Sequence, residues 1–384
     1  MPSTNKNIVV CHVAPVHTAE DGRVFRRACV SLAEEGYDTH LFAFSEKTTE
    51  HINLGVTIHP VYYKNRFQRF SIRRKIVDEI IKLKPDIIHV HDPEILGNVL
   101  SKSDDIPVIF DIHEHFLDIL VDREWIPKIF RPIIKKLWDI NEKYLIKKCH
   151  KLIVVTEGVA KRYTDLGYKP EIIHNYPSLD EINSVKPNKS DDFYCVYAGS
   201  INPDSGLESA IEAFVIIKSL GFKISFKIAG DADEKYAEKI KTLIKKNNLS
   251  DIVKYYGLIP RNDAIKLVSG ASLGIMLYLP IRNNLVALPN KIFEYMAYSI
   301  PFIYSELPLV SQILDDKNVG IKVNPYDPEM IANEIIKLYK NKALCKQYGD
   351  NGNKMIKEIY NWEIEKEKLL DLYDNIKQRF YCFE

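Results

Sequence analysis

A glutamate near the start of one predicted helix has the residue type and the position needed to bind sugar hydroxyls. Glu294 lies one turn after Asn290, within the stretch ALPNKIFEYMAYSIPFIYSELP at 287–308. A carboxylate there can accept two hydrogen bonds from hydroxyls that are spaced as in a ribose. The helix N-terminus beside it favours anions through its free N–H groups and its dipole. A nucleotide offers both sugar hydroxyls and phosphate. The alternative is a solvated glutamate on an ordinary amphipathic helix.

The same stretch must form a helix between two loops to position this carboxylate. Pro289 suits the first turn of a helix, where its missing N–H costs nothing. Apolar residues then recur at helical spacing, at Phe293, Met296, Ala297 and Ile300. Pro301 ends the helix, and residues 302–304 form a short buried strand. The pattern therefore predicts a loop, a helix, a strand and a second loop.

This stretch resembles the C-terminal signature PNKxFEYMAxGxPxI of one branch of the retaining glycosyltransferase family 4. Four further pieces resemble the N-terminal half of that family: PDIIHVHD, FDIHEHF, LIVVTEGVAKRY and IIHNYP. The resemblance implies the α/β fold GT-B, in which two Rossmann-like doubly wound domains face a cleft. It also implies transfer of a sugar from a nucleotide-sugar donor, with retention at the anomeric carbon. By the same resemblance, Glu294 binds the donor ribose and His113 donates to the transferred sugar.

The sequence departs from the family pattern at two places. The family usually has a carboxylate eight positions before the ribose-binding glutamate, and this chain has Val286 there. The family also clamps the donor diphosphate with two cations in the loop after the first strand of its C-terminal half. In this chain Ser200 and Ser205 occupy those places, between Gly199 and Gly206. Because the leaving nucleoside diphosphate carries about two to three negative charges, we expect other groups to neutralise it.

Three cations near this edge are candidates for the missing clamp. Lys291 at the helix start is the first choice, ahead of Arg282 in the preceding loop and Arg261 after the strand 253–257. An exposed lysine without a ligand is the alternative for Lys291. Backbone N–H groups near 288–290 would complete the phosphate site.

The loop after the first predicted strand, 8–13, lies at the carboxyl edge, where doubly wound sheets bind ligands. It contains Asp21-Gly22-Arg23 and no GxGxxG, which argues against a dinucleotide-binding dehydrogenase. By the resemblance, this loop meets the donor phosphates and the acceptor. Arg23 is either a phosphate partner or a solvated arginine at a helix cap. The predicted donor-binding set is Gly22, Arg23, Gly199, Ser200, Ser205, Arg261, Arg282, Leu288, Pro289 and Asn290, and the catalytic set is His113, Lys291 and Glu294.

Histidines follow two other predicted strands at the same edge. His89 and His91 belong to the strand that begins near Pro85, and His113 and Glu114 follow the strand 107–112. Such a cluster could bind zinc. We nevertheless predict no metal, because alternation points His89 and His91 alike whereas His113 comes from a separate strand. The sequence also specifies no fourth ligand.

The composition is that of an ordinary globular protein, with 46% hydrophobic and 27% charged residues in a chain of 384. A net charge of +1 gives no overall attraction to nucleic acid. The six cysteines are scattered without metal spacing and predict free thiols in a reducing compartment. We find no signal peptide, and no apolar run approaches the roughly 20 residues that cross a bilayer. The chain is therefore predicted to be cytoplasmic.

Two basic segments with interleaved apolar residues, 64–84 and 123–148, could lie on the inner face of an anionic membrane. The alternative is that their apolar faces pack on the sheet and their lysines are solvated.

Strands and helices alternate along both halves of the chain, which predicts two parallel-sheet domains. The predicted N-terminal domain, on the acceptor side, spans 1–177 and gains a C-terminal helix at 362–384. Residues 178–192 are polar and form the predicted linker, and 193–361 form the predicted domain that binds the nucleotide-sugar.

The sequence thus predicts a glycosyltransferase that uses a nucleotide-sugar as substrate and needs no cofactor. The acceptor is predicted to be a saccharide or a lipid-linked saccharide, in bacterial surface polysaccharide synthesis. Two alternatives remain open. One is a glycosyltransferase-like subunit that binds without turnover, and the other is a sugar-nucleotide epimerase of the same fold.

Overall fold

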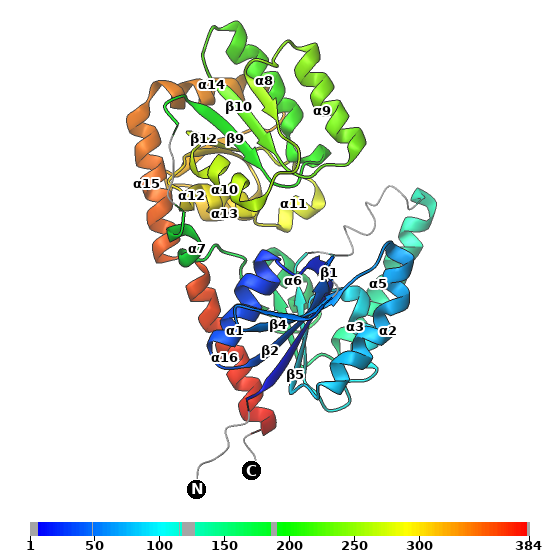
Figure 1. The fold of residues 1–384 in the computed structure, drawn as a ribbon. Helices are drawn as coiled ribbons and strands as arrows, with labels where there is room; N and C mark the ends of the chain where they lie inside the picture. Colours follow the sequence, from blue (N-terminus) through cyan, green and yellow to red (C-terminus); the bar gives the residue numbers. More distant parts are fainter. Residues whose placement is uncertain (1–6, 48, 115, 117–126, 186–189, 382–384) are drawn as a thin grey trace. The chain divides into compact units, whose positions relative to one another are not determined.

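The computed structural model describes residues 7–47, 49–114, 116, 127–185 and 190–381. The chain divides into two compact units (Figure 1). Unit 1 contains the residues up to Asn175 together with those from Glu363 onward, and unit 2 contains Tyr176–Trp362. Each unit is an α/β layer structure with helices packed against a central sheet (Figure 1).

The sheet of unit 1 has the strand order β3-β4-β2-β1-β5-β6-β7-β8. Its pairs are parallel except for β3 with β4. The order reverses direction between β1 and β5, and ligands bind at such switch points in doubly wound sheets. The strands are β1 (Val9–Thr18), β2 (Asp38–Phe44), β3 (His51–Asn53), β4 (Val56–Val61), β5 (Ile87–Val90), β6 (Val108–Ile112), β7 (Lys151–Val154) and β8 (Glu171–Ile172). The helices are η1 (Gly22–Cys29), α1 (Val30–Glu34), α2 (Arg66–Lys82), α3 (Pro93–Leu100), η2 (Lys128–Phe130), α5 (Arg131–Ile146), α6 (Glu157–Asp165) and α16 (Trp362–Tyr381).

The sheet of unit 2 is parallel throughout and has the order β11-β10-β9-β12-β13-β14. Its switch point lies between β9 and β12. The strands are β9 (Tyr194–Ala198), β10 (Ser225–Ala229), β11 (Val253–Tyr255), β12 (Leu273–Met276), β13 (Phe302–Ser305) and β14 (Gly320–Val323). The helices are α7 (Leu179–Asn183), η3 (Pro203–Ser205), α8 (Leu207–Ser219), α9 (Glu234–Lys246), α10 (Arg261–Ser269), α11 (Arg282–Val286), α12 (Asn290–Ala297), α13 (Pro308–Leu314), α14 (Pro328–Lys340) and α15 (Lys342–Glu358).

Alternate residues of β9 face two separate cores of unit 2. Cys195 and Tyr197 join a core formed with α8, α9 and α14. Tyr194 and Val196 join a core on the other face, formed with α10, α12 and α13. This alternation is the period of two that a strand imposes, and it explains why β9 appears in the sequence as a continuous apolar run. The predicted two-domain α/β fold class is confirmed.

Three segments differ locally from the sequence-based expectation. β1 continues to Thr18, through residues predicted as loop, because Thr18 still pairs with Phe44 beyond a bulge. Gly22 and Arg23, which were predicted as part of this loop, already belong to a helix with π-type turns, because the Asp21 carboxylate accepts hydrogen bonds from the N–H groups of Arg23 and Val24. The stretch predicted as a linker contains the short helix α7, which packs against the core of unit 2. The sequence-based domain boundaries themselves stay a prediction.

Among the residues that the structure describes, no helix combines the length and the apolar composition required to cross a bilayer.

Helix α16 is attached to unit 1 by buried polar contacts. Nδ1 of His174 lies 3.3 Å from Oε1 of Glu365 on α16, and Nε2 of His174 lies 3.2 Å from Oε1 of Glu157 on α6. The Tyr373 hydroxyl lies 2.7 Å from Nδ1 of His89. These contacts fix α16 against residues that are about 190 to 280 positions earlier in the chain.

This attachment predicts a pH dependence of stability. Burial alone would lower the pKa of His174, but its bonds to Glu157 and Glu365 raise it above the ordinary 6.5. The hydrogen bond to His174 lowers the pKa of Glu157, and His174 with Lys368 lowers that of Glu365 against the effect of burial. The charged imidazolium of His174 therefore stabilises the fold fully below pH 6.5, and this stabilisation is lost as the pH rises through the raised pKa of His174. The carboxylates contribute fully above their ordinary pKa of 4.5, and their contribution is lost as the pH falls through the lowered values.

We expect His174→Gln to lower the free energy of unfolding by about 1.5–3 kcal/mol between pH 5 and 6, since hydrogen bonds to charged groups contribute this much. The difference from the wild type should shrink as the pH rises above about 7. Denaturant unfolding of both proteins across this range measures it. A difference that is constant with pH would contradict a charged His174.

Candidate functional site

The loop after β9 and the start of α12 meet at the carboxyl edge of the unit 2 sheet. Gly199 opens this loop with φ +136°, and an added Cβ would lie 2.4 Å from Nζ of Lys291. Gly206 closes the loop with φ +71°, and its Cβ would lie 1.9 Å from the carbonyl oxygen of Leu277. Gly206 has no room for a side chain, and a side chain at Gly199 would displace the end of Lys291, so the two glycines let the backbone come close to Lys291 and to Leu277 after β12.

Lys291 is a buried cation whose neighbours are aromatic. Its residue is 7% exposed, and Nζ donates a hydrogen bond of 2.8 Å to the Tyr278 hydroxyl. Nζ also lies 4.5 Å from the centre of the Tyr197 ring. Across the described part of the chain, no ion pair joins Lys291 to a carboxylate. Because a buried charge without a counterion is costly, this arrangement favours an anionic ligand beside Gly199.

The first turn of α12 is open to a ligand. Pro289 is the N-cap residue, and no side chain accepts a hydrogen bond from the N–H groups there. Asn290 and Glu294 are exposed, whereas Pro289 is buried and Leu288 partly buried. The helix therefore presents N–H groups without a side-chain cap and an exposed carboxylate one turn apart, next to a buried ammonium group.

The other predicted donor-binding residues of unit 2 are placed differently. Arg261 pairs with Glu181 at 3.1 Å, and Arg282 is exposed on α11. Ser205 is buried and donates to the carbonyl oxygen of Asn202 at 2.6 Å. The exposed Ser200 accepts a hydrogen bond from the Tyr197 hydroxyl through its carbonyl oxygen. Of the three candidate cations, the structure brings Lys291 to the glycine loop.

Arg23 of unit 1 differs from both interpretations made from the sequence. It is 6% exposed, and its Nη2 and Nε donate to the two carboxylate oxygens of Asp111 at 2.9 and 3.1 Å. A third bond of 2.9 Å runs from Nη1 to the carbonyl oxygen of Ile173. Arg23 is therefore neither a solvated cap residue nor free to pair with a phosphate, and Gly22 before it opens η1. Burial alone would raise the pKa of Asp111, but the Arg23 guanidinium, with His113 and His91, holds it well below its usual range.

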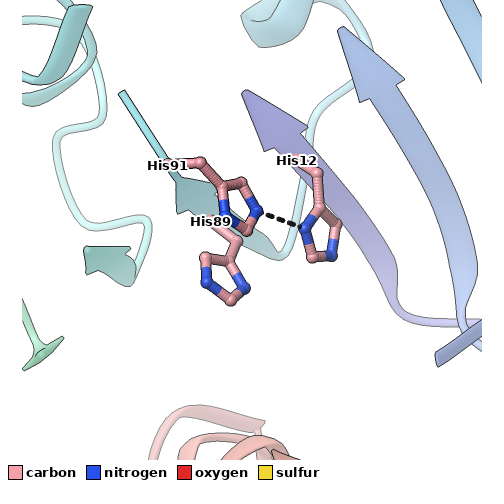
Figure 2. Close-up of side chains that lie close together, drawn as sticks. All are labelled: His12, His89 and His91. Atoms are coloured by element: carbon pink, nitrogen blue, oxygen red, sulfur yellow. Dashed lines mark hydrogen bonds between the residues drawn. The ribbon is translucent and has the colours of Figure 1, made fainter. Parts of the chain in front are cut away.

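Four histidines lie at the switch point of unit 1. Figure 2 shows His12 from β1 beside His89 of β5 and His91, which directly follows β5; a hydrogen bond of 2.9 Å joins Nδ1 of His12 and Nε2 of His91. Nδ1 of His91 in turn lies 3.2 Å from Nε2 of His113. Burial lowers the pKa of His12, His89 and His91 well below the ordinary value, so these rings are neutral.

His113 does come from a separate strand, as predicted, but this does not keep it away from His91. β5 and β6 are neighbours in the sheet, and His113 follows directly after β6. Within the described residues, two groups could hold a metal: His12, His89 and His91, and His91, Asp111 and His113. The prediction of no metal rested partly on that separation and stays untested.

Sequence reasoning missed His12, Asp111, Tyr197 and Tyr278. His12 had a detectable signal, because it is the one polar residue of the apolar run 8–13 and pairs with His89 in the sheet. Asp111 had a similar signal within the strand 107–112. The two tyrosines had none, since nothing in the local sequence indicates that their rings surround the ammonium group of Lys291.

Both halves of the chain match models of sugar-transferring enzymes. Residues 22–179 match the family described as Glycosyltransferase Family 4, and residues 179–355 match Glycosyl transferases group 1. An uncharacterized glycosyltransferase of Methanocaldococcus jannaschii is 27% identical over 318 residues, which cover 80% of this chain and 82% of that protein. The capsular polysaccharide biosynthesis glycosyltransferase CapM of Staphylococcus aureus is 23% identical over 363 residues, 89% of this chain and 91% of that protein.

The fold is also that of solved glycosyltransferase structures. HepE of Anabaena in complex with UDP-glucose superposes with a TM-score of 0.72, at 12% identity, over 96% of this chain and 100% of that chain. At this identity the match concerns the fold alone.

Proposed function

Since the chain is a glycosyltransferase with GT4-type matches in both halves, we propose that it transfers a sugar from a nucleotide-sugar to a hydroxyl of a saccharide or lipid-linked acceptor, with retention. The matches support the resemblance to glycosyltransferase family 4 that the sequence motifs indicate. Membership of its PNKxFEYM branch is part of our proposal. CapM, a capsular polysaccharide enzyme, supports an acceptor in surface polysaccharide synthesis. The UDP-glucose complex of HepE, a protein of the same fold, supports a nucleotide-sugar donor.

The buried Lys291 ammonium group is the observation that carries this proposal. The donor diphosphate would lie over the glycine loop, where its negatively charged oxygens would contact Nζ of Lys291 and the N–H groups at the start of α12. The exposed Glu294 would accept hydrogen bonds from the ribose hydroxyls one turn further along. The role of His113 towards the transferred sugar rests on the family resemblance alone.

The proposed chemistry uses no protein nucleophile. The bond between the anomeric carbon and the phosphate oxygen breaks, and a bond from the acceptor oxygen forms on the same face. The departing phosphate oxygen takes the proton of the acceptor hydroxyl, which balances the step. The protein supplies position and charge stabilisation, and Lys291 provides the charge where it develops.

A donor-binding measurement tests this assignment. We expect one of the UDP-, GDP- or ADP-sugars to raise the melting temperature, because a ligand at 100 Kd adds about 2.7 kcal/mol of stability. Glu294→Ala should weaken binding of that donor by about 10- to 100-fold, because the ribose hydroxyls lose their hydrogen bonds to a charged carboxylate. Glu329→Ala on α14, a glutamate in the first turn of another helix, is the matched control and should bind normally.

Turnover separates the alternatives that the sequence left open. Hydrolysis of the bound donor that is equal in wild type and Glu294→Ala would favour a subunit that binds without turnover. An epimerised sugar nucleotide formed from the donor alone would reveal an epimerase. Donor binding unchanged in Glu294→Ala would contradict the ribose assignment.

Helix α5 carries the surface that we propose for an anionic membrane. Its exposed apolar residues form a row at helical spacing: Ile133, Leu137, Ile140 and Tyr144, each 56–62% exposed. The alternative in which the whole apolar face of this segment packs on the sheet does not hold for this row. Exposed lysines flank it, among them Lys135, Lys136, Lys147 and Lys148. Apolar insertion together with basic flanks is the combination that binds acidic lipid surfaces.

We expect the protein to sediment with vesicles of phosphatidylserine and phosphatidylcholine at low salt, and less so as salt increases. Leu137→Glu should reduce the bound fraction severalfold, because it places a charge in the apolar row. Leu258→Glu, at a residue of unit 2 that is 76% exposed, is the control and should sediment as the wild type does. Absence of salt-sensitive binding by the wild type would remove the membrane from this proposal.

A further inference from the structure

We propose that His91, Asp111 and His113 form a binding site for a divalent transition-metal ion such as Zn²⁺. Three ligand atoms lie at the corners of a nearly regular triangle. Oδ2 of Asp111 is 3.3 Å from Nδ1 of His91 and 3.2 Å from Nε2 of His113, and the two nitrogens are 3.2 Å apart. Ligands at about 2.0 Å from a tetrahedral zinc are about 3.3 Å from one another. The triangle therefore has the dimensions of one face of a zinc tetrahedron.

Hydrogen bonds alone cannot make all three contacts among these ligand atoms favourable. Both carboxylate oxygens of Asp111 accept hydrogen bonds from Arg23, so Asp111 contributes no hydrogen to the triangle. Only Nδ1 of His91 and Nε2 of His113 can carry one, so at most two hydrogens serve the three edges. One edge therefore always brings two like groups together, whether two lone pairs or two N–H groups. A cation at the centre turns all three contacts into favourable ones.

The groups around the triangle support the same assignment. Nε2 of His91 can donate to Nδ1 of His12, which leaves Nδ1 of His91 bare and directed at the ion. The Asp111 carboxylate is fixed by the bidentate contact to Arg23. Metal-bound histidines and carboxylates are typically held by such outer hydrogen bonds. Two histidines and one carboxylate form the ligand set of several catalytic zinc sites, in which the fourth position stays open.

The neighbouring group of His12, His89 and His91 fits an ion less well. These rings stack, with interplanar angles of 14–32° between them (Figure 2). Imidazole lone pairs lie in the plane of the ring, so stacked rings direct them side by side rather than at one point. The group is also fully buried and contains no carboxylate to balance a divalent charge. The rings of His91 and His113, in contrast, meet at 65°, and His113 is 18% exposed.

Of the three ligands His113 is the most exposed, at 18%, so we place the open position of the site beside it. There the ion would fix the His113 ring and bind water or an oxygen of a hydroxyl or phosphate. The net charge of Arg23, Asp111 and a divalent ion is positive, so an anionic oxygen would be favoured in that position. The inference does not depend on the proposed sugar transfer, because metal binding is measured on the protein alone.

Cobalt titration tests this site. The protein is purified without a histidine tag, treated with a chelator, and titrated with Co²⁺ while the visible absorption is recorded. We expect about one Co²⁺ per chain with the intense bands of a tetrahedral site, displaced by Zn²⁺. His113→Gln should weaken binding at least tenfold, because even outer-shell losses cost about 10- to 100-fold. The substitution lies on a partly exposed loop, and circular dichroism confirms that the variant is folded.

His17→Gln is the matched control. Its ring meets that of His113 at 4.9 Å, but its Nδ1 pairs with Asp92 at 3.1 Å, so the variant should bind Co²⁺ as the wild type does. Wild-type uptake that is no greater than that of folded His113→Gln would overturn the proposal. So would binding that survives in His113→Gln and is lost in His12→Gln, since this result would assign the ion to the stacked histidines.

Discussion

Replacing Lys291 by methionine should lower kcat/KM for sugar transfer by about 10²- to 10³-fold, which corresponds to the loss of one preorganised charge-stabilising group. The methylene chain is retained, so packing against Tyr197 and Tyr278 changes little. What disappears is the buried ammonium group beside Gly199. The loop lacks the two cations expected after β9, and Ser200 and Ser205 stand in their places. We therefore expect Lys291 to neutralise a larger share of the diphosphate charge than it would beside a complete clamp.

The measurement uses the donor selected by the thermal-shift screen and compares transfer or donor hydrolysis in variant and wild type. Lys266→Met on α10 is the matched control, because Lys266 is 77% exposed in the same unit, and its rate should be unchanged. Unfolding curves of Lys291→Met should overlay those of the wild type or shift to higher stability, since a buried charge has been removed. A normal rate in folded Lys291→Met would place the diphosphate elsewhere.

Replacing Arg23 by methionine should destabilise unit 1 by about 3–5 kcal/mol, the usual cost of leaving one partner of a buried ion pair alone. Asp111 is 2% exposed and would keep its charge without the guanidinium that now binds both of its oxygens. The carbonyl oxygen of Ile173 would lose its donor as well. For a unit of this size, the melting temperature should fall by about 10 °C or more.

A double variant separates the cost of the lone charge from that of lost packing. Arg23→Met with Asp111→Leu removes both charges and replaces them by apolar groups, which is often neutral or stabilising for buried pairs. We expect it to recover at least half of the loss seen in Arg23→Met. A double variant as unstable as the single one would show that packing of the Arg23 side chain, and not its charge, holds this part of unit 1.

The sequence identified most elements because both sheets are built from buried parallel strands. The predicted first strand at 8–13 and the predicted strand 107–112 correspond to the start of β1 and to β6, because each is a continuous apolar run. The strands β3 and β4 were missed because His51–Asn53 is only three residues long and β4 contains Pro60. Local pattern carries little information for such short or interrupted strands.

The pairing of side chains from distant parts of the chain was beyond sequence reasoning. Arg23 and Asp111 are 88 positions apart, and His12 and His91 are 79 apart. Each residue alone is compatible with a solvated or a ligand-binding role, and only the sheet order decides between them. Lys291 and Glu294 were found because their helix has a recognisable signature, but the burial of one and exposure of the other depend on the position of α12 against β9 and β12.

The attachment of α16 to unit 1 has a consequence for biosynthesis. The residues from Glu363 onward are made only after all of unit 2 has been translated, yet Tyr373 and Glu365 complete contacts to His89 and His174. The nascent first unit therefore lacks these two contacts until α16 has been made, although His174 can already pair with Glu157, while the second unit, continuous from Tyr176 to Trp362, can form without delay.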